Sequence, residues 1–448
     1  MHIGKQAVVI GAGMAGLAAA RALADHFEHV QVLERDALPA VPVPRPGTPQ
    51  SWHLHGLLAG GMQALECLFP GFTEDLRRAG AVPVRINADL REEYPGFGAL
   101  PQRDFGSLAY TASRALLELT VRRCLTRHAN VALRDRCRVA EIVAAPDGRR
   151  IMGVRCTEAG AGWCETVPAD LVVDASGRGS LILGLLQSTG RRLPRESLVG
   201  IDLGYASAIV AIPQDAPSGW KGLLTHPKAP DDVRHCVMFP IEGNRWMITQ
   251  VGRKDIVPPG DWHGFVEYSR GLSTPTLYDA IRHARPLGRV MRYAFPDSTW
   301  RHFEQLAEWP DGVLPIGDAI CRFNPVYGQG MTVAAQEAWA LQRLLDEWAK
   351  ERDPLAGLGA RFLAEVRPLI ETPWTMAALP DFLYPDTRGE RPADLEQRLQ
   401  FAGALRRIAI RDPAVHKLTV EVWHLLKPFD VYRDPDLARR VADEMADA

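Results

Sequence analysis

The chain has 448 residues, a length that predicts two or three compact units rather than one. Hydrophobic residues make up 46% of it and charged residues 24%, which excludes a chain that is disordered throughout. The formal net charge is −2, so we expect no nucleic-acid partner and no attraction to an anionic membrane surface. No apolar run is long enough to span a membrane. Seven cysteines without a CxxC pair favour reduced thiols and a cytoplasmic location.

The first forty residues predict a strand, a glycine-rich loop, a helix and a second strand. Residues 7–10 are apolar, as in a strand buried on both faces, and helix-forming residues continue to about residue 24. Residues 29–34 predict the second strand, which ends in an acid. Residues 7–20 could also be the apolar core of a signal peptide, but that interpretation leaves the glycine spacing and the second strand without a role.

The loop between these elements has the spacing Gly-x-Gly-x-x-Gly. Gly11 permits a tight turn, Gly13 lets the backbone approach a pyrophosphate, and Gly16 lets helix and strand pack closely. The free N–H groups of the helix N-terminus attract phosphate oxygens. Glu34 follows Gly16 by 18 residues and can accept hydrogen bonds from a ribose. The pattern therefore predicts dinucleotide binding, and the alternative is a glycine-rich turn that only packs two elements together.

Later segments predict two further strand ends of the same kind. Residues 130–174 predict a β-meander that returns to the first sheet, with a turn at 146–148. An apolar run then ends at Asp174 and is followed by a loop of small residues. A second apolar run ends at residues 317–331, before a long predicted helix over about 331–350. Because ligands gather at the carboxyl ends of parallel strands, we expect the three loops to converge on one elongated ligand.

The middle and the end of the chain carry no nucleotide motif. Residues 198–212 and 237–251 have strand character, and residues 242–244 predict a hairpin turn, so we expect a mainly antiparallel sheet. The last hundred residues or so predict helices that are broken by four prolines: Pro380, Pro385, Pro413 and Pro428.

Three motifs carry a resemblance to a known family: GAGMAG at 11–16, DASGRGS at 174–180 and GDAICRFNPVYGQGM at 317–331. Together they resemble the flavin monooxygenases that are similar to para-hydroxybenzoate hydroxylase and squalene epoxidase. The pairing of PQSWHLH at 49–55 with LECLFPG at 65–71 resembles a bacterial branch that includes epoxidases of polyether antibiotic biosynthesis. The resemblance covers nearly the whole chain.

The resemblance implies a fold and a domain organisation. The fold class is α/β, with a Rossmann-type, glutathione-reductase-like FAD-binding domain, an antiparallel-sheet substrate domain and a helical C-terminal region. The FAD-binding domain is discontinuous and covers residues 1–185 and 295–350. The substrate-binding sheet covers residues 186–294, and the helical region covers residues 351–448. The sheet is expected to cover the flavin, with the substrate pocket between these layers.

The resemblance also implies a role for individual residues. Glu34 binds the adenosine ribose with Arg35 beside it, and the backbone at Val139 meets the adenine. Arg114 opens a helix along the cofactor, unless it is only a surface charge. Asp318 binds the ribityl chain, unless it only caps a helix. The residues expected to contact FAD are Gly11, Ala12, Gly13, Met14, Ala15, Gly16, Glu34, Arg35, Arg114, Val139, Asp174, Ala175, Gly177, Gly317, Asp318, Pro325, Gly328, Gln329, Gly330 and Met331.

The activity implied by the resemblance is a single-component monooxygenase. NAD(P)H reduces FAD transiently, the reduced flavin reacts with O2 to give a C4a-hydroperoxide, and one oxygen passes to an electron-rich ring or an alkene of a lipophilic or aromatic small molecule. A flavin-dependent halogenase, a reductase or dehydrogenase of the same fold, and a non-enzymatic FAD-binding protein remain as alternatives. The WxWxIP segment usual in halogenases is absent from the sequence.

Gln50, His53 and His55 are the candidate catalytic residues. They lie in the segment that such enzymes bring across the dinucleotide towards the flavin ring. A neutral imidazole can donate to the flavin or accept a hydrogen bond from a substrate hydroxyl, and we favour His55 over His53. Two histidines at i and i+2 without a third nearby ligand argue against a metal, and packing in the core remains the alternative role for both.

Overall fold

The computed structural model describes residues 2–158 and 164–446. At its centre is a five-stranded parallel sheet with the order β17-β11-β1-β2-β7. In chain order its strands are β1 (Gly4–Ile10), β2 (Phe27–Leu33), β7 (Val131–Arg134), β11 (Leu171–Asp174) and β17 (Val313–Pro315). Strand β11 is buried along its whole length, as expected for a strand covered on both faces.

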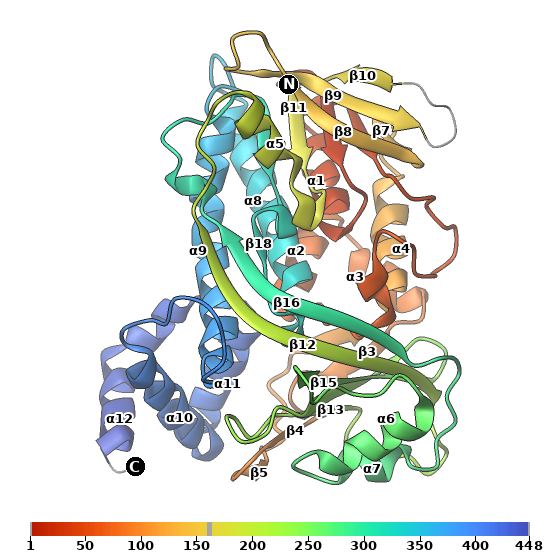
Figure 1. The fold of residues 1–448 in the computed structure, drawn as a ribbon, viewed down its shortest axis with the longest axis vertical. Coiled ribbons are helices and arrows are strands. Elements are labelled where there is room, and N and C mark those ends of the chain that lie inside the picture. The colour runs from red at the N-terminus through yellow and green to blue at the C-terminus, as the bar shows by residue number, and fades with distance from the viewer. Residues whose placement is uncertain (1, 159–163, 447–448) are drawn as a thin grey trace.

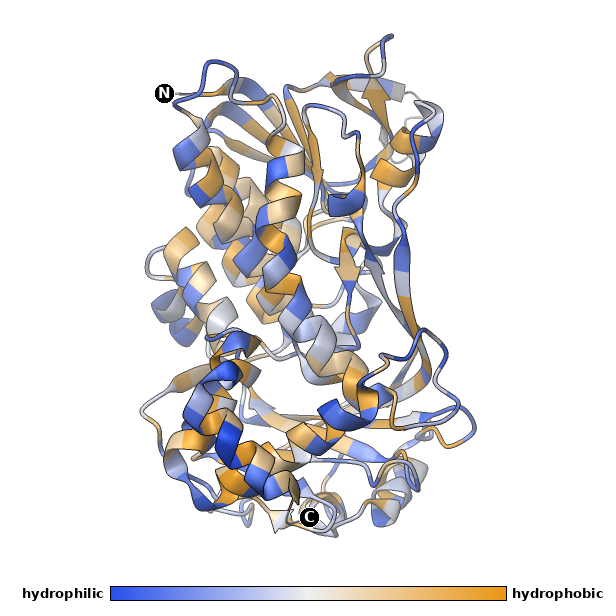
Figure 2. Ribbon diagram, turned by 90° about the vertical axis from the view of Figure 1, so that its left-hand side faces the viewer, coloured by the Kyte–Doolittle hydropathy of each residue, from blue (hydrophilic) through white to orange (hydrophobic). Residues whose placement is uncertain are grey.

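Helices and a small meander cover this parallel sheet (Figure 1). The helices of this part of the molecule are α1 (Met14–Ala24), α2 (Ala59–Leu68), α3 (Phe72–Arg78), α4 (Arg114–Leu125), α5 (Leu181–Ser188) and α8 (Gly330–Trp348). The meander consists of β8 (Cys137–Ala144), β9 (Ile151–Glu158) and β10 (Cys164–Pro168). Figure 2 shows stripes of hydrophobic and hydrophilic residues along the helices, as expected where only one face of a helix is packed.

An eight-stranded sheet forms the second layer, with the order β18-β16-β12-β15-β14-β13-β4-β5. Its strands are β4 (Leu90–Tyr94), β5 (Gly98–Ala99), β12 (Glu196–Ala211), β13 (Gly222–Thr225), β14 (His235–Ile241), β15 (Arg245–Arg253), β16 (Met291–Arg301) and β18 (Cys321–Arg322). All pairs are antiparallel except β13 with β4. Helices α6 (Trp262–Tyr268) and α7 (Thr276–Ile281) pack their apolar residues against it.

Four helices end the chain: α9 (Leu358–Asp381), α10 (Leu395–Arg411), α11 (Pro413–Trp423) and α12 (Pro435–Ala446). The prediction that Pro380 breaks a helix is wrong, because Pro380 lies inside the last turn of α9 together with the earlier Pro368 and Pro373. Helix α9 buries Phe362 and Val366 in the core, and this tertiary packing stabilises the helix despite the backbone N–H groups that its prolines lack. Pro413, by contrast, opens α11, where its missing N–H costs nothing.

The structure corrects one strand and confirms the others. Residues 131–134 were predicted as part of the meander, but they pair in parallel with β2 inside the first sheet. The meander itself begins at β8, and its turn at 146–148 is present, with the Gly148 N–H donating to the Ala145 carbonyl. The hairpin turn at 242–244 is also present, and Gly243 and Asn244 take the positive φ angles that such a turn needs.

Residues 7–20, the alternative signal-peptide core, form the end of β1, the glycine loop and the start of α1. They are mostly buried in the core. Within residues 2–158 and 164–446, no helix is long and apolar enough to cross a membrane. In the same ranges no group of three or more His, Cys, Asp or Glu side chains could hold a metal ion.

The close approach of α1 to the loop after β1 gives a direct test of the fold. A Cβ at Gly16 would lie 1.9 Å from the Gly11 carbonyl oxygen, a backbone atom that cannot move away cheaply. We expect Gly16→Ala to lower the free energy of unfolding by about 1–3 kcal/mol, measured by urea denaturation. Gly184→Ala, at an exposed position of α5, is the control. Its Cβ would meet no atom within 4 Å, so the substitution is expected to be neutral or stabilising. Equal stability of the two variants would contradict this packing.

Candidate functional site

Three loops lie side by side at the carboxyl edge of the parallel sheet, as the sequence pattern predicted. Strand β11 pairs with β1 on one side and with β17 on the other. The Ala175 N–H donates to the Ile10 carbonyl at 3.0 Å, and the Ile316 N–H donates to the Asp174 carbonyl at 3.0 Å. The loops that follow β1, β11 and β17 are therefore neighbours in space.

The first loop leaves open space in front of α1. Gly11 has φ +99°, and a Cβ there would lie 2.7 Å from the Ala175 carbonyl oxygen, so the first two loops touch through backbone alone. At Gly13 a Cβ would meet no atom within 4 Å. Gly13 is the N-cap of α1, and no side chain caps the helix. This uncapped helix end beside open space is suited to bind a phosphate group.

Glu34 lies at the end of β2, but its carboxylate is already engaged by protein groups. It accepts hydrogen bonds from the Ala12 N–H at 2.8 Å and the Asp36 N–H at 3.0 Å. Arg45 lies 3.2 Å from the same carboxylate. The adjacent Arg35 is exposed. Glu34 thus ties the glycine loop to the segment after β2, and its remaining acceptor capacity is limited.

A buried charge network behind Glu34 was not predicted from the sequence. Arg45 pairs with Asp36 and Glu118, both at 2.9 Å, and Glu118 pairs with Arg114 at 2.7 Å. Burial would raise the pKa of Glu118, but the charges of Arg114 and Arg45 outweigh burial and lower that pKa. Arg114 is 5% exposed, so the alternative of a surface helix charge is wrong. The i, i+4 spacing of Arg114 and Glu118 could have revealed their pairing, whereas nothing in the proline-rich loop singled out Arg45.

Asp318 presents a free carboxylate beside the third strand end. It lies in the short 3₁₀ turn η5 (Gly317–Ala319), which has no side-chain cap, and α8 begins only at Gly330. The cap alternative is therefore wrong. The side chain is exposed and makes no hydrogen bond to the described residues, yet desolvation raises its pKa against the opposing charges of Arg322 and Arg114. An exposed group that the protein still desolvates is expected in a cleft rather than on an outer surface.

A buried side chain supports the loop that contains Asp318. Glu337 on α8 is completely buried and accepts a hydrogen bond from the Gly317 N–H at 2.7 Å, while its other oxygen has no partner among the described residues. Desolvation raises the pKa of Glu337 to about 8, so its carboxyl is largely protonated at neutral pH.

The loop at 325–331 is fixed by the side chains of Asn324 and Asp381 and lies against the backbone at Gly56. Asn324 accepts from the Val326 N–H at 3.1 Å and so caps the 3₁₀ turn η6 (Pro325–Tyr327). The Asn324 amide donates to Asp381 at 3.0 Å, and burial raises the pKa of that carboxyl to about 7. Gly328 has φ +66°, and a Cβ at Gly56 would come within 3.9 Å of its Cα. The segment that contains the two histidines therefore lies against this loop.

His53 and His55 face different surroundings. His53 is buried, and its Nδ1 lies 2.8 Å from the Ser207 hydroxyl, while its ring lies near Tyr205 and Tyr293. His55 is half-buried, and its Nδ1–H donates to the His53 carbonyl oxygen at 2.9 Å. The Nε2 atom of His55 therefore carries the lone pair. Desolvation and the nearby charge of Arg114 lower the pKa of His55 to about 3, so the ring is neutral.

The remaining candidate residues have plainer environments. The Gln50 side chain is half-buried and makes no hydrogen bond to the described residues. Asp174 is completely buried and accepts from Ser180 Oγ at 2.9 Å and the Ile182 N–H at 3.1 Å, so it shapes its own loop and does not face open space. Val139 lies at a bulge in β8, a strand whose first N–H donates to the Glu34 carbonyl.

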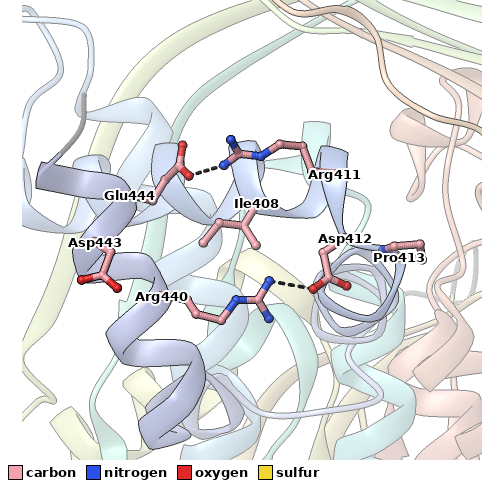
Figure 3. Close-up of a pocket in the computed structure, with 7 residues that line it drawn as sticks. All are labelled: Ile408, Arg411, Asp412, Pro413, Arg440, Asp443 and Glu444. Carbon is pink, nitrogen blue, oxygen red and sulfur yellow. Dashed lines mark hydrogen bonds and ion pairs between the residues drawn. The ribbon is translucent and has the colours of Figure 1, made fainter.

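A separate hollow lies on the surface between α10, α11 and α12 (Figure 3). Arg411 pairs there with Glu444, and Arg440 with Asp412, so both arginines of the hollow are already neutralised. It is remote from the three loops, and we do not assign it to the site.

Comparison with known proteins gives the family. Residues 9–43 match the NAD(P)-binding Rossmann-like domain. Protein Rv3254 of Mycobacterium tuberculosis (strain ATCC 25618 / H37Rv) is 35% identical over 352 residues, which cover 76% of this chain and 72% of that protein. This chain belongs to the same family as Rv3254. A kynurenine 3-monooxygenase of Salinispora tropica is 25% identical over 355 residues, with coverage of 76% and 72%.

Solved structures with the same fold belong to flavin enzymes. The flavin-dependent brominase Bmp2 matches with a TM-score of 0.66 at 15% identity, covering 94% of both chains. PqsL of Pseudomonas aeruginosa, described as a probable FAD-dependent monooxygenase, matches with a TM-score of 0.64 at 17% identity, covering 86% of this chain and 97% of its own. The chain has the fold of the FAD-dependent monooxygenases and halogenases: a Rossmann-like domain of the FAD-binding type, an antiparallel sheet and C-terminal helices.

The open space at Gly13 and the free carboxylate of Asp318 predict two FAD-binding defects. Gly13→Ala places a Cβ where a pyrophosphate would lie, so FAD affinity is expected to fall about tenfold or more. Asp318→Ala removes a charged acceptor and is expected to weaken FAD binding by about 1.5–3 kcal/mol, roughly ten- to a hundredfold. Both are measured by fluorescence titration of apoprotein with FAD.

Folding serves as the control for both variants. Their free energies of unfolding without FAD should stay within about 1 kcal/mol of wild type, since a Cβ at Gly13 would meet no protein atom within 4 Å and the Asp318 side chain makes no hydrogen bond to the described residues. Asp318→Asn, which retains an acceptor, should lose less affinity than Asp318→Ala. Unchanged FAD affinity in both alanine variants would show that these residues do not contact the cofactor.

Glu337 predicts a pH-dependent stability. Its pKa of about 8 in the folded protein exceeds the ordinary value of 4.5, so the folded state holds the proton more tightly. The resulting stabilisation is fully present below pH 4.5 and is lost as the pH rises through about 8. Glu337→Gln cannot ionise, so its stability relative to wild type should rise between pH 5 and pH 8.5, measured by urea denaturation. A difference that is constant with pH would contradict the raised pKa.

Proposed function

We propose that this protein is an FAD-dependent monooxygenase that uses NAD(P)H and O2 to hydroxylate or epoxidise a lipophilic small molecule. The observation that carries this proposal is the arrangement of three groups along the three adjacent loops. They are the uncapped end of α1 beside the open space at Gly13, the free carboxylate of Asp318 and the loop 325–331. A ligand with a diphosphate, a polyol chain and a flat ring in that order matches this arrangement, and FAD has that order.

The residues present fit the pyrophosphate, ribityl and isoalloxazine parts of FAD. We assign the pyrophosphate to the first turn of α1 and the ribityl hydroxyls to Asp318. The isoalloxazine would lie against Pro325 and residues 328–331, where the N-terminus of α8 has no side-chain cap and a Cβ at Gly330 would meet no atom within 4 Å. When bound, FAD would accept a hydride from NAD(P)H and, once reduced, activate O2 for transfer of one oxygen atom to the substrate.

His55 is the side chain that we assign to the reaction. It precedes Gly56, whose backbone lies against Gly328 of the loop 325–331, here called the flavin loop. The His55 ring is neutral, and its Nε2 lone pair can accept a hydrogen bond from a substrate hydroxyl or amine. The hydrogen bond to the His53 carbonyl fixes both its orientation and its tautomer. His53 is held by Ser207 and by packing, so we assign it a positioning role.

The domain proposal follows the same layers. The Rossmann-like part at 1–185 and 295–350 would hold FAD, and the antiparallel sheet would form one wall of the substrate pocket. Strands β4 and β5, which lie within residues 90–99, join that sheet, so the pocket would take residues from both parts of the chain. The sequence similarity to a kynurenine 3-monooxygenase supports oxygen transfer as the reaction type.

An isotope experiment separates this proposal from its alternatives. The FAD-loaded protein is supplied with NADH or NADPH and with pooled polyenes and phenols under ¹⁸O2, and products are analysed by mass spectrometry. A monooxygenase incorporates one ¹⁸O atom, a reductase changes the hydrogen content without ¹⁸O, and a halogenase gives halogenated products when bromide or chloride is present. Products without ¹⁸O would contradict the proposal.

The role of His55 is tested by coupling. A mispositioned substrate lets reduced flavin and O2 react without oxygen transfer, so His55→Ala should lower the yield of oxygenated product per NAD(P)H consumed by about twofold or more, with a matching rise in H2O2. The exposed His263→Ala is the matched control and should leave coupling unchanged. If His55→Ala retains full coupling while it folds and binds FAD normally, His55 is only a packing residue.

A further inference from the structure

The C-terminal helices meet the antiparallel sheet next to the flavin loop. On the sheet side, Tyr94 of β4 stacks on His226 with ring centroids 3.5 Å apart, and Glu92 lies 2.8 Å from the same imidazole. On the helix side, the Arg406 guanidinium lies 4.0 Å over the Tyr94 ring. Figure 1 shows β4 and β5 beside the last helices of the chain. This surface therefore joins two regions that are far apart in the sequence.

The end of α11 brings the same surface to the flavin loop. The Trp423 ring lies edge-on to Tyr327 of the loop, with centroids 6.0 Å apart. The next residue, His424, lies near enough to Glu92 for that carboxylate to raise its pKa, and Asp381 raises the pKa of Tyr327. These interactions link β4, the flavin loop and α11 around one space.

The side chains around that space are partly exposed. Tyr94, His226, Tyr327 and His424 are each half-buried by exposed area. In all four, desolvation by the surrounding protein is nevertheless the largest cause of the pKa shift. These four side chains are therefore candidate contacts for a ligand beside the flavin loop.

The tautomer of His424 is fixed by the backbone. Its Nδ1 accepts a hydrogen bond from the Ala59 N–H at 3.2 Å, at the start of α2. Desolvation lowers the pKa of His424 to about 4, so the ring is neutral near pH 7. In a neutral ring with Nδ1 as acceptor, Nε2 carries the hydrogen. No described residue accepts a hydrogen bond from that Nε2–H, and the ring is held in place by its other nitrogen.

His55 has the opposite tautomer, since its Nδ1–H donates and its Nε2 accepts. It lies four positions before Ala59, the residue that anchors His424. The segment 55–59 therefore has a neutral imidazole at each end: His55, with a free acceptor nitrogen, at its start, and His424, with a free donor nitrogen, bound to Ala59 at its end. The donor nitrogen makes no hydrogen bond to the described residues.

We infer that His424 is a substrate-binding residue whose Nε2–H donates a hydrogen bond to a carbonyl oxygen on a flat aromatic or conjugated substrate. This inference rests on the proposed function. The half-buried rings of Tyr327 and of Trp423, the residue before His424, favour a flat ligand. Arg406 makes no ion pair within the described residues, but its positive charge is offset by the nearby negative charge of Glu92. With no net positive charge available, a neutral carbonyl is favoured over a carboxylate as the acceptor.

Two substitutions separate substrate binding from a purely structural role. His424→Asn keeps an acceptor near the Nδ1 position, where it can still bind the Ala59 N–H, and removes the donor at Nε2. His424→Gln places an amide donor near the Nε2 position and weakens the contact with Ala59. If His424 only caps the start of α2, His424→Asn should behave like wild type. If His424 donates to the substrate, His424→Gln should behave like wild type and His424→Asn should not.

The probes are acetophenone and α-methylstyrene, which have the same shape but differ in a C=O against a C=CH2 group. Each is titrated into the FAD-loaded protein, and binding is followed by the change in flavin absorbance. Wild type and His424→Gln should bind acetophenone about fivefold more tightly than α-methylstyrene, as one hydrogen bond allows. His424→Asn should bind both probes equally while retaining FAD and folding stability.

Three results would overturn the inference. They are discrimination that persists in His424→Asn, wild-type protein that does not discriminate between the probes, and wild-type protein that binds FAD but neither probe. Failure of the proposed function is a different result, because the wild-type protein would then not take up FAD and its absorbance spectrum would show this before any probe is added.

Discussion

The parallel pairing of β11 with β1 and β17 is the constraint on which the site depends. It places the loops after three strands at one edge of the sheet, although they are separated by well over a hundred residues of sequence. Helix α1 packs against the first loop so closely that there is no room for a Cβ at Gly16, which lies against the Gly11 carbonyl. The first turn of α1, with its uncapped N-terminus, also lies beside the residue before Asp318, because a Cβ at Gly317 would lie 2.8 Å from the Ala15 Cβ. The electrostatic character of the site thus follows from strand order and one close backbone contact.

A second level of organisation comes from the C-terminal helices, which complete the site from behind. Asp381 at the end of α9 holds Asn324, which caps the turn before Gly328. His424 at the end of α11 anchors the start of α2, and so the segment that carries His55. The flavin loop and the histidine segment are therefore both fixed by residues from the last hundred of the chain. Substitutions in α9 or α11 would therefore alter the site even where the substituted residue does not contact a ligand.

Local pattern was enough to predict the strand–loop–helix unit at the N-terminus, the strand ends at 174 and 317, and the hairpin at 242–244, because each depends on neighbours in sequence. The place of residues 131–134 was missed, since a strand's partner is decided by tertiary packing and not by its own periodicity. Arg45 and His424 were missed because their partners, Glu118 and Ala59, lie 73 and 365 residues away. Asp174 had the residue type and position of a ligand contact, but its carboxylate turned inward to order its own loop. The sequence alone therefore predicted the three strand ends but not the distant residues that hold them in place.

The most direct test of this account is a crystal structure of the protein with FAD. We predict FAD density along the three loops, with the pyrophosphate within hydrogen-bonding distance of the first-turn amides of α1 and a ribityl hydroxyl within hydrogen-bonding distance of Asp318. The isoalloxazine should lie between residues 325–331 and His55. FAD bound elsewhere, or FAD in this cleft with its ring turned away from His55 and the 325–331 loop, would contradict the account.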